Sequence, residues 1–247
     1  MELSKNVALI SCATQGAGPV LAEVLAAEGA RVYLQDIDRN SLHDLKDRLA
    51  TRGYSVEAVN SNPNIISQVR QAIQRISDRE GHLDLLVNNT TGPSQSAQAT
   101  EDDPYLPALT NDIRGVFNFS RAVADQMKRQ RGGAIINILY SATASNPLFS
   151  LTRALASTLS PYNVWVSALS ARTNQAFGQD EPGSGKSPPM ASREVVVQTV
   201  LLMLSVRPYS WVSGGKGRSS EKEPRRSLLP ESRPDRLSLL LPNVSGG

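Results

Sequence analysis

Two glycines stand in a turn that is suited to binding phosphate. Gly16 and Gly18 lie between a short apolar segment at Asn6–Ile10 and a segment with helical spacing of Leu and Ala at Pro19–Glu28. A glycine-rich turn between a strand and a helix lets backbone N–H groups approach a pyrophosphate, which the helix N-terminus then holds. This spacing predicts a dinucleotide-binding turn near the start of the chain.

Acidic, phenolic and hydroxyl side chains follow later segments of the chain. Asp112 lies in a long helical segment, and Tyr140 and Ser141 come directly after an apolar one. A carboxyl group beside a phenol and a guanidinium such as that of Arg172 can serve as an acid and base pair. We expect these groups at one edge of a sheet. The structural alternatives are that Asp112 caps or binds backbone and that Tyr140 only fills space.

Histidine and cysteine are rare in the chain. His43 and His82 have no Cys or second His at metal-ligand spacing, so no metal site is predicted. The single cysteine, Cys12, cannot form an internal disulfide. Its place in the glycine-rich turn leaves two interpretations, a reactive thiol with a lowered pKa at a helix N-terminus or a small buried side chain.

The elements that would position these residues alternate between strand and helix. The predicted strands are Asn6–Ile10, Arg31–Gln35, Ser55–Val59, Leu83–Asn88, Ala134–Ile138 and Val164–Leu169. The predicted helices are Pro19–Glu28, Ser41–Arg52, Ile65–Asp78, Pro107–Gln130, Leu151–Leu159 and Ser192–Ser205. Such alternation builds right-handed parallel β-α-β units. The sequence therefore predicts an α/β fold, a Rossmann-like doubly wound parallel sheet in a single domain over residues 1–213.

The composition changes at the end of the chain. Residues 214–247 are rich in Gly, Ser, Pro and Arg and predict a low-complexity basic tail. The apolar segment 237–242 is either a terminal strand or a frayed end. Seven cations and four anions in the tail account for the whole net charge of +3, so the domain is near neutral. Without interleaved aromatic residues, a solvated tail is favoured over nucleic-acid binding.

Length and hydrophobicity limit the class of protein. The chain has 247 residues, of which 40% are hydrophobic, which suits one large α/β domain. No apolar run approaches the roughly 18 to 20 residues that cross a bilayer. The N-terminus lacks the pattern of a secretory signal. These features predict a cytoplasmic protein that is not an integral membrane protein.

Five segments resemble the short-chain dehydrogenase/reductase superfamily in the order that the superfamily has them. They are ATQGAG (13–18), LDLLVNN (83–89), RGVFNFSRAV (114–123), GGAIINI (132–138) and LTRALASTLSPYNVWVSAL (151–169). The resemblance covers roughly residues 1–213. It implies an oxidoreductase ancestry, NAD(P) binding and a homo-oligomer formed through the helices that follow the fourth and fifth strands.

The resemblance also implies which residues contact the cofactor. These are Ser11, Gly16, Gly18, Asp36 and Asn88. Asp36, 18 residues after Gly18, matches the acid that accepts a hydrogen bond from a ribose 2′-OH and favours NAD over NADP. The alternative for Asp36 is a solvated loop acid. Cys12 stands where the family has the first glycine of the turn.

The catalytic positions depart from the family. Asp112 stands at the place of the structural Asn, and Tyr140 at that of the catalytic Ser, with Ser141 beside it. No Lys occurs between Lys128 and Lys186, so the Y-x-x-x-K segment looks deleted. Ordinary carbonyl reduction is not expected. Three alternatives stay open: a divergent NAD enzyme, non-redox chemistry on a small hydrophobic substrate (cyclisation, isomerisation or dehydration), or a non-catalytic relative that binds a ligand or partner.

Overall fold

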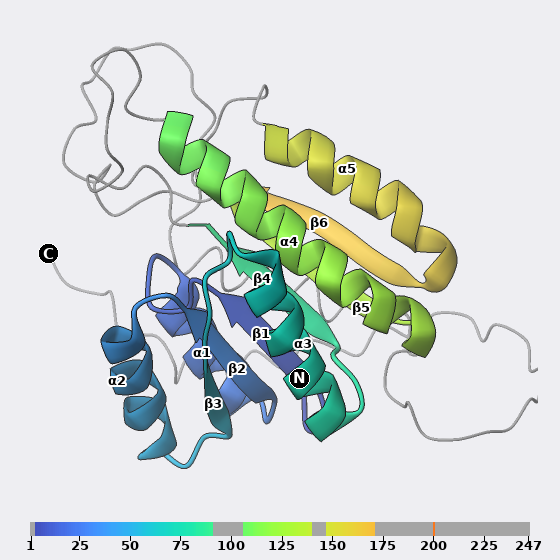
Figure 1. Ribbon diagram of the computed structural model, residues 1–247. Coiled ribbons are helices and arrows are strands. Elements are labelled where there is room, and N and C mark those ends of the chain that lie inside the picture. The colour runs from blue at the N-terminus through green and yellow to red at the C-terminus, as the bar shows by residue number, and fades with distance from the viewer. Residues whose placement is uncertain (1–2, 91–105, 140–146, 171–199, 201–247) are drawn as a thin grey trace, which may run out of the picture. The chain divides into compact units, whose positions relative to one another are not determined.

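Six strands in the described part of the chain form one parallel sheet (Figure 1). They are β1 (Val7–Ser11), β2 (Arg31–Asp36), β3 (Val56–Asn60), β4 (Leu85–Asn89), β5 (Gly133–Leu139) and β6 (Val164–Ser170). Their order across the sheet is β3-β2-β1-β4-β5-β6. The direction of winding reverses where β1 lies beside β4, with Ser11 opposite Asn88. The predicted Rossmann-like, doubly wound α/β fold is confirmed.

The computed structural model describes residues 3–90, 106–139, 147–170 and 200. The chain divides into two units, Met1–Gly214 and Gly215–Gly247, and every described residue belongs to the first. The predicted tail at 214–247, with its apolar segment 237–242, lies outside the described residues. So does the predicted helix at 192–205, except for Val200, which is helical and fully buried.

Helices cover both faces of the sheet. They are α1 (Gly18–Ala27), α2 (Arg39–Ala50), α3 (Ile66–Glu80), α4 (Leu106–Gln130) and α5 (Pro147–Leu159), followed by a 3-10 turn at Ser160–Tyr162. Ile10 packs on the face that α1 and α2 cover, and Leu9 on the face that α3, α4 and α5 cover. Figure 1 shows α4 and α5 side by side on that second face. Because both faces are covered, the central strands β1, β4 and β5 are buried along their whole length.

The predicted boundaries agree with the structure to within two residues, with one exception. Helix α5 begins at Pro147, four residues before the predicted start at Leu151. Proline suits the first turn of a helix, where its missing N–H would have no intrahelical partner. The predicted start of this helix at Leu151 was therefore four residues too late.

The helices do not have the character of membrane spans. Within the described residues, none combines the length and the apolar composition that crossing a bilayer requires.

Candidate functional site

The glycine-rich turn joins β1 to α1 at the carboxyl edge of the sheet. Gly16 has φ +55°, in the left-handed region that favours glycine. A Cβ on Gly18 would lie 2.5 Å from the Ala13 carbonyl oxygen, so only glycine allows this close approach. The two glycines thus keep the turn tight and its backbone accessible.

Two neighbouring strands hold the turn in place. Asn89 at the end of β4 donates from Nδ2 to the Cys12 and Gln15 carbonyl oxygens, each at 2.8 Å. Gln35 in β2 accepts from the Cys12 N–H at 3.3 Å and donates to the Ser61 carbonyl oxygen at 2.6 Å. These amides fix the turn from both sides. The sequence did not single them out as supports of the turn, although a polar residue at a strand end beside β1 is a signal for such a role.

The N-terminus of α1 has the form of an anion site. Its N-cap residue, Ala17, makes no side-chain hydrogen bond, and Pro19 stands in its first turn. Ser11, the last residue of β1, is buried just before the turn. A helix N-terminus carries a partial positive charge that favours a phosphate. The geometry therefore suits the pyrophosphate of a dinucleotide.

Cys12 occupies the place of the first glycine of the turn and takes a glycine-like conformation. Its φ is +49°, which costs a residue with a Cβ roughly 1 to 2 kcal/mol. Burial raises the pKa of the Cys12 thiol, and the carboxylates of Asp36 and Asp112 raise it further. The interpretation of Cys12 as a reactive thiol with a lowered pKa is wrong, because desolvation and two nearby negative charges disfavour the thiolate.

Asp36 ends β2 and is only 2% exposed, so it is not a solvated loop acid. Its Oδ2 accepts from the backbone N–H of Thr14 at 3.1 Å and from the Thr14 hydroxyl at 2.7 Å. Its Oδ1 accepts from the N–H groups of Ile37 at 2.7 Å and Asp38 at 3.3 Å. The carboxylate thereby ties the glycine-rich turn to the start of the β2–α2 connection.

Asn88 belongs to a polar group inside the core. The residue is fully buried, and its Nδ2 donates to Ser120 Oγ at 3.1 Å and to Asn137 Oδ1 at 2.8 Å. Asn137 in turn donates from Nδ2 to Thr152 Oγ1 at 2.8 Å. The group links β4 and β5 to α4 and α5. Asn88 and its neighbour Asn89 thus serve different faces of the sheet, and Asn89 is the one bonded to the glycine-rich turn.

Of the three predicted catalytic residues, the structure describes one. Asp112 lies in α4, is half-buried, and is close enough to Cys12 to raise its pKa. The structure therefore brings Asp112 toward the same turn as Asp36. Tyr140, Ser141 and Arg172 lie outside the described residues, so their place beside Asp112 stays a prediction.

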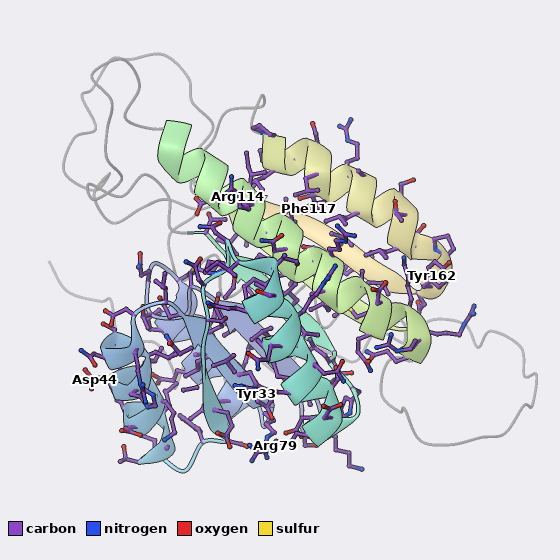
Figure 2. The ribbon with its side chains drawn as sticks, viewed as in Figure 1. Tyr33, Asp44, Arg79, Arg114, Phe117 and Tyr162 are labelled. Carbon is purple, nitrogen blue, oxygen red and sulfur yellow. The ribbon has the colours of Figure 1, made fainter. Side chains whose placement is uncertain are left out.

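A second charged group lies away from the turn. Arg31 Nε is 2.7 Å from Glu80, Arg79 Nη2 is 3.0 Å from Glu57, and the Tyr33 hydroxyl donates to Glu80. Figure 2 shows Tyr33 and Arg79 at the same end of the domain. Arg31 begins β2, whereas Asp36 ends it, so these ion pairs sit at the opposite edge of the sheet from the glycine-rich turn.

Metal ligation has no support in the described part of the chain. No group of three or more His, Cys, Asp or Glu side chains there is arranged to hold a metal ion. His43 lies exposed on α2, and His82 contacts backbone carbonyls and Asp84.

Comparison with known proteins identifies individual proteins that this chain resembles. The chain is 33% identical over 137 residues to the oxidoreductase UcpA of Salmonella typhimurium, which covers 55% of this chain and 51% of that protein. The structure is similar to NAD+-bound xylitol dehydrogenase, with a TM-score of 0.69, 22% identity, and coverage of 83% and 94% of the two chains.

A second solved structure carries the other nicotinamide cofactor. A gluconate 5-dehydrogenase from Burkholderia cenocepacia J2315, in complex with NADP and tartrate, matches with a TM-score of 0.60 and 26% identity. The match covers 72% of this chain and 77% of that one. The structural relatives therefore include both NAD and NADP binders.

The family match spans most of the folded domain. Residues 6–173 match the family described as short chain dehydrogenase, a range that includes all six strands and the glycine-rich turn. The match with UcpA covers about half the length of that relative. Together with the strand order and the turn at the reversal point, the match shows that this chain belongs to the short chain dehydrogenase family.

Proposed function

We propose that the protein binds a nicotinamide dinucleotide across the carboxyl edge of its sheet, with the pyrophosphate at the N-terminus of α1. The observation that carries this proposal is the position of the glycine-rich turn. It sits where β1 meets β4, at the reversal of the strand order, in front of the N-terminus of α1, whose N-cap residue is an alanine. Ligands of open α/β sheets bind at such a reversal point.

The residues around the turn fit the cofactor. Gly16 and Gly18 leave the backbone open to a pyrophosphate, and Ser11 lies at the end of β1 beneath it. Ile37 follows Asp36 directly and is 59% exposed, which offers an apolar surface to a flat base. When bound, the nicotinamide group accepts or gives a hydride; the chain's own part is to hold and orient it.

The chemistry that follows binding departs from the ordinary family reaction. A Lys that lowers the pKa of a catalytic Tyr is missing, since none occurs between Lys128 and Lys186. We infer a degenerate family member, a small-molecule enzyme without the usual Tyr and Lys proton relay. Asp112 is then the candidate acid or base on α4, with Tyr140 and Ser141 as its predicted neighbours.

The same absence favours a second candidate function. A carboxyl and a phenol suffice for a cyclisation, an isomerisation or a dehydration of a small hydrophobic substrate, none of which needs hydride transfer. A non-catalytic relative that binds a ligand in the crevice is the remaining alternative. Once an activity is found, unchanged turnover in both Asp112→Asn and Tyr140→Phe would exclude these residues from it.

Titration calorimetry with NADH and NADPH tests the binding proposal. Micromolar binding of NADH in preference to NADPH supports Asp36 as the residue that selects the cofactor. Equal binding of both keeps the dinucleotide site and refutes the selection by Asp36. Absence of binding to either refutes the proposed function and favours a site for another ligand.

We propose that the protein forms a homo-oligomer and that its compartment is the cytoplasm. Phe117 is 43% exposed on α4 and lies near the exposed Arg114 (Figure 2). Arg121, also exposed, follows Phe117 by four residues in the same helix. An exposed aromatic side chain flanked by arginines has the composition of an interface core. Sedimentation equilibrium of the full chain tests this, and a monomer at every concentration would refute it.

A further inference from the structure

The carboxylate of Asp36 has no acceptor position left for a ligand. A carboxylate offers about four lone-pair positions. Thr14 fills two of them, one through its backbone N–H and one through its hydroxyl, and the N–H groups of Ile37 and Asp38 fill the other two. With the residue 2% exposed, a ribose hydroxyl can reach this carboxylate only if one of these donors leaves.

Of the four donors, only the Thr14 hydroxyl can leave without moving the main chain. The N–H groups of Ile37 and Asp38 belong to the connection after β2. That connection is itself held, because Asn60 Nδ2 donates to the carbonyl oxygens of Asp36 and Ile37, each at 3.0 Å. A rotation about χ1 alone turns the Thr14 hydroxyl away from Asp36. Because Thr14 is half-buried, the rotated hydroxyl can form a hydrogen bond with solvent.

We propose that Thr14 is a latch on Asp36 that sets the affinity of the site for nucleotides with a free ribose 2′-hydroxyl. The inference rests on the proposed dinucleotide binding and deepens it. In the latched state the Thr14 hydroxyl occupies the acceptor position that the ribose hydroxyl needs. Binding then exchanges one hydrogen bond to the carboxylate for another, and the net gain is small.

The latch makes a prediction about cofactor choice. Removing the Thr14 hydroxyl leaves one lone pair of Oδ2 vacant, and a ribose 2′-OH can donate to it. NADPH carries a 2′-phosphate, which has no proton to donate and is repelled by the carboxylate. Unlatching therefore strengthens the binding of NADH and of ADP-ribose and leaves that of NADPH unchanged.

The experiment compares Thr14 variants by titration calorimetry with NADH, NADPH and ADP-ribose. Thr14→Val keeps the backbone N–H and the side-chain shape, and we expect it to bind NADH and ADP-ribose about tenfold more tightly than the native chain. Thr14→Ser, which keeps the hydroxyl, stays within about threefold of the native affinity by the same bond count. Thr14→Ala replaces Thr14→Val if that variant does not fold.

A matched control separates the latch from a general effect of losing a threonine hydroxyl. Thr51 donates from Oγ1 to the Arg48 carbonyl oxygen at 2.9 Å, at the far end of α2. Thr51→Val loses a comparable bond away from the turn and should leave all three affinities unchanged.

The outcomes separate a failure of the latch from a failure of the proposed dinucleotide binding. If the native chain binds NADH and Thr14→Val binds it equally or more weakly, the latch is refuted while the dinucleotide site stands. Tighter binding of NADPH in Thr14→Val to the same degree as NADH also refutes it. If no variant binds any of the three nucleotides, both proposals fall together. Binding of NADH by the native chain, with about tenfold tighter binding by Thr14→Val and unchanged binding of NADPH, supports the latch.

Discussion

The bond between Asn137 and Thr152 is buried, and its contribution to stability can be worked from the structure. Thr152 Oγ1 accepts from Asn137 Nδ2 at 2.8 Å and donates to the Leu148 carbonyl oxygen at 2.6 Å. Thr152→Val keeps the shape of the side chain but removes the oxygen, which leaves an amide N–H of the fully buried Asn137 without its acceptor. An unsatisfied buried donor costs about 1 to 3 kcal/mol.

Helix α5 supplies the control for this substitution. Thr158 also donates from Oγ1 to the carbonyl oxygen four residues before it, that of Ala154, at 2.8 Å, but Thr158 is exposed. Thr158→Val therefore removes an equivalent intrahelical hydrogen bond but leaves no buried group without its hydrogen-bond partner. The difference between the two variants isolates the contact with Asn137.

The assay is equilibrium unfolding in urea, followed by circular dichroism and extrapolated to water for the native chain and both variants. We expect Thr152→Val to lower the free energy of unfolding by about 1 to 3 kcal/mol more than Thr158→Val does. A difference below about 0.5 kcal/mol, with equal urea slopes, would refute the conclusion that this polar group stabilises the packing of α5 on the sheet.

Two further predictions concern the turn and a histidine at the far edge of the sheet. Gly18→Ala places a Cβ 2.5 Å from the Ala13 carbonyl oxygen, so it should abolish nucleotide binding and destabilise the fold by about 1 to 3 kcal/mol, as overpacking does. Gly81→Ala, at φ +78° with nothing within 4 Å, should cost about 1 kcal/mol in backbone strain and leave binding intact, and equal binding by both variants would contradict the steric argument. Burial lowers the pKa of His82, but the Lys5 carbonyl, the Asp84 carboxylate and Glu80 together raise it above the ordinary value. The stability that His82 contributes should therefore be full below the unfolded pKa of about 6.5 and fall as the pH rises through the higher folded pKa. Urea unfolding of the native chain and of His82→Gln from pH 5.5 to 8.5 checks this, and a difference that does not vary with pH would contradict it.

The fold could be predicted from local features of the sequence. The apolar run at Leu83–Asn88 and the glycine-rich turn after Ile10 are continuous in sequence, and each indicates its element without reference to distant residues. The predicted start of α5 was four residues too late; proline both ends and begins helices, so Pro147 alone does not mark the start of one. Whether Pro147 begins a helix depends on whether the residues after it pack on β5. The spacing of those residues in the sequence does not reveal this packing.

The sequence predicted several of the residues that belong to the candidate site, but not the hydrogen bonds between them. Asp36 is polar and lies two residues before Asp38, so its burial could not be inferred from the sequence. The contact of Thr14 with Asp36 joins residues 22 apart, and that of Asn89 with Cys12 joins residues 77 apart. Such bonds arise only when β1, β2 and β4 lie side by side; a polar residue at a strand end indicates that a bond can form there, but not which residue is its partner.

The glycines of the turn do not by themselves show whether the turn binds a nucleotide or has lost that function. A Cβ on Gly18 would collide with the protein's own Ala13, and Gly16 has a positive φ, so folding requires both residues whether or not a cofactor binds. Cys12 shows that the first glycine could be replaced at a modest cost in strain. Groups that must change partner when a nucleotide enters report on binding more directly than these glycines do. The Thr14 hydroxyl on Asp36 is such a group, so a change in nucleotide affinity on its substitution reports on the site itself, whereas the loss of a glycine also disturbs folding.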